Sequence, residues 1–125
     1  MDKTVRAQIL LVEDDFMLRH AFKLLLEDAG YAITEAGTAA QAIEIAQRDK
    51  PDLILLDLGL PDANGLDVAR ALRKDGMHET PILALTGRVG AEEKAACIEA
   101  GCTSYLTKPI EPKVLMKRLE EFLVD

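Results

Sequence analysis

The sequence is poor in cysteine, in aromatic residues and in long apolar segments. Its only cysteines, Cys97 and Cys102, are too few for a disulfide framework and lack the paired spacing of a zinc site. No stretch approaches the roughly 20 uninterrupted apolar residues of a membrane helix, and residues 1–6 lack the apolar core of a secretory signal. We therefore expect a cytoplasmic protein in which both thiols pack as small apolar side chains.

Basic residues are also in the minority. The sequence has 15 Lys and Arg against 22 Asp and Glu, which gives a formal net charge of −7. An acidic chain disfavours non-specific binding to nucleic acid, and no aromatic-and-basic pattern overrides this, so we expect neither a nucleic-acid nor a membrane partner. A length of 125 residues fits one domain, 1–125, and leaves no room for a second catalytic or DNA-binding domain.

Short apolar runs alternate along the chain with amphipathic segments, as is typical of a parallel sheet covered by helices on both faces. We expect a flavodoxin-like, doubly wound α/β fold, a three-layer (βα)5 sandwich with strand order 2-1-3-4-5, because crossovers are right-handed. The expected strands are 9–12, 32–35, 53–56, 81–85 and 104–106. The expected helices are 16–28, a second opened by a capping box at Thr38 and Gln41, a third through 66–72, a fourth over 92–100 and a fifth from about Pro112.

Apolar spacing also predicts the buried faces of the first and last helices. The first helix carries apolar residues at helical spacing at Leu18, Ala21, Phe22 and Leu25. The last helix does so at Val114, Leu115, Leu119 and Phe122. We expect these positions to face the sheet.

Four polar residues each follow an apolar run: Asp14, Asp57, Thr86 and Lys108. In an open α/β sheet ligands bind outside the carboxyl ends of the strands, so we expect these four side chains to share one rim. Two acids, a hydroxyl and an ammonium predict a site for a divalent cation and a transferable phosphoryl group.

The acidic part of this rim favours Mg²⁺. Burying Glu13, Asp14 and Asp15 together with Asp57 would be repulsive without a cation, and Mg²⁺ prefers oxygen ligands. Asp57 is the predicted nucleophile, because a carboxylate that attacks phosphorus forms an acyl phosphate. The ammonium and the hydroxyl would meet the phosphoryl oxygens. The alternative interpretation is a solvated acidic loop followed by a turn aspartate.

The segments that carry these residues resemble the receiver domain of bacterial two-component response regulators, of the single-domain chemotaxis or cell-cycle-regulator type. The matching segments are 9–14, 55–65, 84–87 and 105–110. The resemblance implies that Asp57 accepts a phosphoryl group from a phosphohistidine on a sensor histidine kinase or a histidine phosphotransfer protein. It also implies Mg²⁺, or Mn²⁺ in its place, bound by Glu13, Asp14, Asp57 and the Gly59 carbonyl.

The resemblance further implies a switch. Thr86 moves toward the phosphoryl group and Tyr105 turns inward, which changes a surface for a downstream protein on the fourth helix, the fifth strand and the fifth helix. A cis peptide is expected between Lys108 and Pro109, and Arg88 is expected to influence hydrolysis of the acyl phosphate. Such a protein is not an enzyme in the ordinary sense, because it catalyses only its own phosphorylation and dephosphorylation.

Three alternatives stay open. A flavin-binding electron carrier shares the topology, although acids after the first strand would repel its phosphate. A haloacid-dehalogenase-like phosphatase also uses an aspartyl nucleophile, although Gly59 occupies the position of its second acid. The third is a receiver cut from a hybrid histidine kinase or a longer regulator. The segment 84–109 resembles receivers of hybrid kinases and stand-alone cell-cycle regulators more than those of transcription factors, and the two ends of the chain lead us to expect a single-domain protein.

Overall fold

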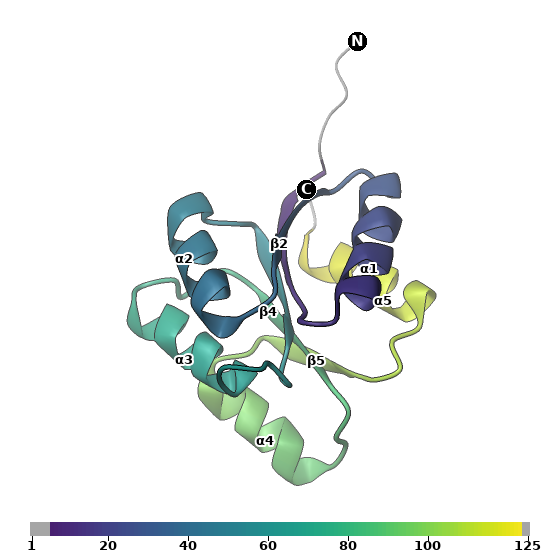
Figure 1. The fold of residues 1–125 in the computed structure, drawn as a ribbon. Helices are drawn as coiled ribbons and strands as arrows, with labels where there is room; N and C mark the ends of the chain where they lie inside the picture. Colours follow the sequence, from purple (N-terminus) through teal and green to yellow (C-terminus); the bar gives the residue numbers. More distant parts are fainter. Residues whose placement is uncertain (1–5, 124–125) are drawn as a thin grey trace.

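The computed structural model describes residues 6–123. The strands are β1 (Gln8–Val12), β2 (Ala32–Ala36), β3 (Leu53–Asp57), β4 (Ile82–Thr86) and β5 (Ser104–Thr107). The helices are α1 (Phe16–Asp28), α2 (Ala39–Asp49), α3 (Gly65–Lys74), α4 (Ala91–Ala100) and α5 (Pro112–Phe122). Neighbouring strands are parallel and follow the order β2-β1-β3-β4-β5, which confirms the expected doubly wound α/β fold (Figure 1).

Helices cover both faces of the sheet, with α1 and α5 on one side and α2, α3 and α4 on the other (Figure 1). Successive residues of a strand point to opposite faces. In β1, Ile9 and Leu11 therefore join the core beneath α1 and α5, whereas Leu10 and Val12 join the core beneath the other three helices. This double covering explains why the central strands are apolar at every interior position.

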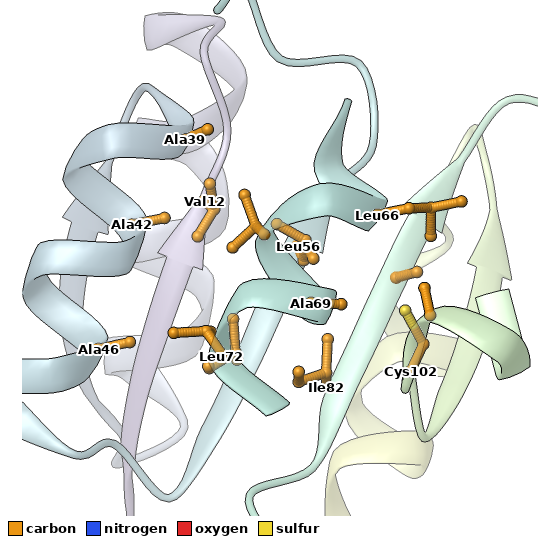
Figure 2. Close-up of a cluster of buried hydrophobic side chains, with 14 of the residues drawn as sticks. Val12, Ala39, Ala42, Ala46, Leu56, Leu66, Ala69, Leu72, Ile82 and Cys102 are labelled. Atoms are coloured by element: carbon orange, nitrogen blue, oxygen red, sulfur yellow. The ribbon is translucent and has the colours of Figure 1, made fainter. Parts of the chain in front are cut away.

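Small side chains let α2 lie close to the sheet. Ala39, Ala42 and Ala46 are buried at helical spacing, and they face the side of the core that holds Val12 and Leu72 (Figure 2). Because alanine adds little volume, the large core residues on this side come mainly from the strands and from α3.

Four strands, β2 to β5, end one residue later than the sequence pattern predicted. β3 includes Asp57, and β4 runs from Ile82 to Thr86 rather than from Pro81 to Leu85. Proline has no N–H to donate to a ladder, whereas the carboxyl ends stay paired: Leu58 N donates to Leu85 O at 3.1 Å and Lys108 N donates to Thr86 O at 2.7 Å. β2 likewise ends at Ala36 and β5 at Thr107, whereas β1 begins at Gln8 and α4 at Ala91, each one residue before the predicted start.

The predicted buried face of α1 is wrong in part. Phe22 and Leu26 are buried, whereas Leu18 is 37% exposed and Ala21 is exposed. The face of α1 that packs on the sheet is instead formed by Phe22 and Leu26, with Leu25 partly buried beside them. The same occurs in α5, where Leu115 and Leu119 are buried but Val114 is 43% exposed.

Side chains cap the starts of α1 and α2. Asp15 accepts a hydrogen bond from Leu18 N at 3.1 Å, which satisfies a free donor of the first turn of α1. Thr38 accepts from Gln41 N at 3.1 Å, as the capping box predicts. The Gln41 side chain accepts from Gly37 N at 2.9 Å, one residue before its expected donor.

Candidate functional site

Three acidic side chains meet at the carboxyl ends of the central strands β1 and β3. The strands are paired with Val12 opposite Leu56, so Glu13 and Asp14, which follow β1, come next to Asp57 at the end of β3. Carboxylate oxygens of Glu13, Asp14 and Asp57 all lie within 4.8 Å of one another. The structure thus brings together the three acids that the sequence placed on one rim.

These acids differ in exposure. Glu13 is 2% exposed and Asp57 is 3% exposed, whereas Asp14 is exposed. Asp15, which we expected beside them, is the cap of α1 instead. Two buried carboxylates at this separation repel each other and have lost most of their hydration, so the site requires compensating positive charge.

Lys108 supplies part of that charge. Its Nζ donates to Asp57 Oδ1 at 2.7 Å and lies 3.8 Å from Glu13 Oε1. The peptide bond before Pro109 is cis, as expected. Burial disfavours the charged ammonium, but the hydrogen bond and the charge of Asp57 outweigh it, so the pKa of Lys108 is raised. The ammonium is therefore a fixed positive charge beside Asp57.

Glu13 is the acid with unmet hydrogen-bonding capacity. Its Oε2 accepts from Asp15 N at 3.2 Å, but within the described part of the chain its buried Oε1 has no hydrogen-bond partner. Burial raises the pKa of Glu13 to about 7, although the bond from Asp15 opposes the shift; the negative charge of Asp57 adds to it. A buried oxygen of this kind is costly to leave unpaired, and it is suited to a bound cation.

Thr86 lies on the other side of Asp57 from β1, at the end of β4. It is 4% exposed, and its hydroxyl makes two hydrogen bonds. Thr86 Oγ1 accepts from Arg88 N at 3.1 Å and donates to Glu93 Oε2 at 3.3 Å. Sequence reasoning missed Glu93, which comes from the first turn of α4; its one signal is its position at the start of the helix that follows β4.

A hollow of about 530 Å³ opens over these groups. It is lined by Asp57, Thr86 and Lys108 together with Glu93 and Arg88. Two glycines, Gly59 and Gly87, also border it, and a Cβ added at either would meet nothing within 4 Å. The hollow therefore gives a small anion direct access to Asp57.

Arg19 is a second residue that sequence reasoning missed. Its Nη1 donates to Glu13 O at 2.8 Å, and its Nε donates to Glu35 Oε1 at 3.0 Å. Arg19 thereby joins α1, the end of β1 and β2 at the position of Glu13. The sequence carries no signal for this contact, because it depends on how α1 packs over the sheet.

Tyr105 lies outside this hollow. It is half-buried on β5 and borders a second hollow of about 520 Å³ between α4, β5 and α5, together with Ile98, Val114 and Arg118. Arg118 Nη1 donates to Tyr105 O at 3.3 Å. Ile98 and Val114 are 60% and 43% exposed, so this face presents apolar side chains to the solvent.

Most of the chain matches a known protein family. The profile of the family described as response regulator receiver domain matches residues 9–120. The chain is 35% identical over 116 residues to the virulence transcriptional regulatory protein PhoP of Shigella flexneri, covering 93% of this chain and 52% of that protein. It is 37% identical over 116 residues to the response regulator MprA of Mycobacterium leprae, covering 93% and 50%. The chain thus spans about half the length of these relatives.

Solved structures agree with this match. The chemotaxis protein CheY4 of Vibrio cholerae superposes with a TM-score of 0.88 at 33% identity, covering 94% of this chain and 98% of that one. In residues 6–123 no helix combines the length and the apolar character needed to cross a membrane.

Proposed function

Because the chain belongs to the response regulator receiver domain family, we propose that Asp57 accepts a phosphoryl group from a phosphohistidine on a sensor histidine kinase or a histidine phosphotransfer protein. An Asp57 carboxylate oxygen attacks phosphorus and an O–P bond forms. The N–P bond of the phosphohistidine breaks, and its electron pair stays on the imidazole nitrogen, which takes up a proton. The observation that carries the proposal is the buried Asp57 carboxylate held 2.7 Å from Lys108 Nζ at the floor of an open hollow.

Lys108 has two tasks in this proposal. Before transfer it orients the Asp57 carboxylate, because Lys108 Nζ donates to Asp57 Oδ1 at 2.7 Å. During transfer the same ammonium lies beside the incoming phosphoryl oxygens and neutralises charge as it develops, which is the main source of catalysis in phosphoryl transfer.

The acidic cluster fits a Mg²⁺ ion, with Mn²⁺ as a substitute. The fit rests on three carboxylates within 4.8 Å and on the buried Oε1 of Glu13, which has no hydrogen-bond partner among residues 6–123. Glu13, Asp14 and Asp57 would hold the ion, and the Gly59 carbonyl is the expected fourth protein ligand. A bound Mg²⁺ supplies charge neutralisation at the phosphoryl oxygens. Without it, the repulsion between Glu13 and Asp57 opposes a further anion at Asp57.

Phosphorylation would then be read by a second protein. Thr86 lies at the hollow and Tyr105 lies on the surface formed by α4, β5 and α5, so a change at Thr86 is connected through β4 and β5 to that surface. We assign the downstream protein to this face, and no nucleic acid to the chain, whose net charge is −7. A phosphohistidine donor places the protein in the cytoplasm, and its chemistry is limited to its own phosphorylation and dephosphorylation.

The acids after β1 and the glycine at position 59 disfavour the two functions of other classes. Glu13 and Asp14 would repel the phosphate of a flavin, and Gly59 cannot supply the second acid of a haloacid-dehalogenase-like phosphatase. A receiver within a longer regulator or a hybrid kinase would use the same site, so the proposal holds for either organisation.

Incubation with acetyl phosphate and Mg²⁺, followed by intact mass spectrometry, tests the proposal. We expect one phosphoryl adduct on the wild type and none on Asp57→Asn. Asp67→Asn is the matched control, because Asp67 is an exposed aspartate of α3 that pairs with Arg70, and it should retain the adduct. An adduct that persists in Asp57→Asn, or one that forms equally with EDTA in place of Mg²⁺, would refute the proposal.

A further inference from the structure

The Thr86 hydroxyl donates a hydrogen bond to Glu93, a residue of α4. A hydroxyl has a single hydrogen to donate, and an ionised carboxylate only accepts, so the 3.3 Å contact between Thr86 Oγ1 and Glu93 Oε2 uses that hydrogen. The bond from Arg88 N, at 3.1 Å, occupies the oxygen from another direction. These two bonds together fix the direction in which the Thr86 side chain donates.

Glu93 is well placed to act as this acceptor. It lies in the first turn of α4, which begins after Gly90 without a side-chain cap, and a helix N-terminus favours negative charge. In the described part of the chain Glu93 takes part in no ion pair within 4.0 Å, so its charge is not neutralised by a lysine or an arginine. Thr86 is 4% exposed, which shields the hydrogen bond from competing water.

Glu93 and Asp57 border the same hollow, with Thr86 between β3 and α4. A phosphoryl group on Asp57 carries acceptor oxygens into that hollow, and the Thr86 hydrogen can serve only one strong acceptor. The Glu93 carboxylate is thus a competitor of the phosphoryl group, and the loss of its bond to Thr86 would release a contact that ties α4 to the end of β4.

We propose that Glu93 is a positioning residue that holds the Thr86 hydroxyl toward α4 and so opposes its use by an anion on Asp57. The inference rests on the proposed function, because it concerns the acceptor that arrives at the same site. On phosphorylation the Thr86 hydroxyl then donates to a phosphoryl oxygen and no longer to the Glu93 carboxylate. The same step removes a contact between α4 and the end of β4. The network joins Asp57 chemistry to the α4 side of the surface that borders Tyr105.

A titration with beryllofluoride and Mg²⁺, as a stable phosphoryl analogue, tests this role. Glu93→Ala removes the competing acceptor, so we expect threefold to tenfold tighter binding, about the effect of one ordinary hydrogen bond. Glu93→Gln keeps an acceptor oxygen without the charge, and its affinity should fall between those of the wild type and Glu93→Ala. Glu92→Ala is the matched control: Glu92 is an exposed acid of the same helical turn, and its removal should leave the affinity unchanged.

A double-mutant cycle separates positioning from simple charge repulsion. In a Thr86→Ala background there is no hydroxyl to release, so Glu93→Ala should no longer tighten binding. A gain of the same size in both backgrounds would show that Glu93 acts only through its charge and would overturn the proposal. Equal affinities of the wild type and Glu93→Ala would overturn it as well.

The position of Thr86 can also be followed with no anion present. The methyl NMR signal of Thr86 should shift in Glu93→Ala and stay in place in Glu92→Ala; an unchanged signal in both variants would contradict the contact. If the wild type takes up neither acetyl phosphate nor beryllofluoride, the proposed function fails and the competition fails with it. If the wild type takes up both while Glu93→Ala behaves identically, only the role of Glu93 fails.

Discussion

The interior of the central strands and their carboxyl ends are equally buried but chemically opposite. Leu10, Leu55 and Leu83 are 0% exposed and belong to an apolar core. The buried polar residues of the described chain, Glu13, Asp57 and Thr86, lie at the carboxyl ends of the same three strands or directly after them. Burial stabilises the fold in the first region, whereas in the second it raises the pKa of Glu13.

The strand interior stabilises the fold, whereas the strand ends carry the candidate site. Apolar side chains in the strand interior lose nothing by leaving water, whereas each carboxylate at the strand ends loses its hydration and gains only part of it back from Lys108 and backbone N–H groups. Groups with perturbed ionisation in a cleft are typical of functional sites. Substitutions in the two regions should therefore change stability in opposite directions.

Leu55→Ala should give the largest loss of stability. Leu55 is 0% exposed in the middle of β3, and truncation leaves a cavity that costs about 2–5 kcal/mol of unfolding free energy. Urea denaturation followed by circular dichroism measures the loss. Leu24→Ala is the control, because Leu24 is 54% exposed on α1 and should cost at most about 0.5 kcal/mol. Equal losses for the two variants would contradict the placement of the core.

Gly65→Ala should disturb the boundary between the two regions. A Cβ at Gly65, the first residue of α3, would lie 2.7 Å from Asp57 O and 2.7 Å from Leu58 Cα, so the backbone that carries Asp57 must move. We expect a loss of about 3 kcal/mol, at the upper end for overpacking, and slower phosphorylation. The same denaturation assay applied to Gly59→Ala, where a Cβ meets nothing within 4 Å, should show a much smaller loss.

The sequence was sufficient to predict the strand interior and most of the rim. Apolar runs and right-handed crossovers gave the strand order, and the order alone placed Asp57 beside Glu13 and Thr86. Cys97 and Cys102 are both buried, as the sequence analysis predicted.

The parts that the sequence did not predict depend on packing between elements. The contact of Thr86 with Glu93 requires the angle at which α4 leaves β4, and the bond of Arg19 to Glu13 O requires the position of α1 over the sheet. The exposure of Leu18 likewise depends on which face of α1 packs on the sheet. Residue spacing within one element carries no information on such distances.

Glu13→Gln should stabilise the metal-free protein at neutral and alkaline pH. The pKa of Glu13 is raised from 4.5 to about 7 in the folded protein. Between these two pH values the folded state binds a proton that the unfolded state has lost, so the wild type becomes less stable as the pH rises through this range. Glutamine resembles the protonated acid and removes this dependence. The difference in unfolding free energy between variant and wild type should grow by on the order of 2 kcal/mol from pH 5 to pH 8.

Added Mg²⁺ should oppose the stability advantage of Glu13→Gln. A cation that binds only the folded wild type raises its stability by mass action, so added Mg²⁺ should narrow or invert the advantage of Glu13→Gln at pH 8. Thermal unfolding with and without Mg²⁺ measures the change. If the difference in unfolding free energy between Glu13→Gln and the wild type does not change with pH, the pKa of Glu13 is the same in the folded and unfolded states, which would contradict the effect of its burial.

Asp62→Asn should give the smallest effect and the opposite pH dependence. Asp62 is exposed, and its two carboxylate oxygens accept from Ala39 N at 2.8 Å and Ala40 N at 3.1 Å at the start of α2. These bonds hold the pKa of Asp62 below its usual 3.8, so its contribution is present above that pH and is lost as pH falls through the folded value. The variant should thus unfold at a slightly lower urea concentration than the wild type at pH 7, and the two midpoints should converge as the pH falls through the lowered pKa of Asp62. Asp67→Asn, which removes only an exposed pair with Arg70, is the control and should change the urea midpoint at pH 7 by less than Asp62→Asn does. A gap that widens toward acid would mean that Asp62 behaves like the buried Glu13, and the contrast between satisfied and unsatisfied carboxylates would fail.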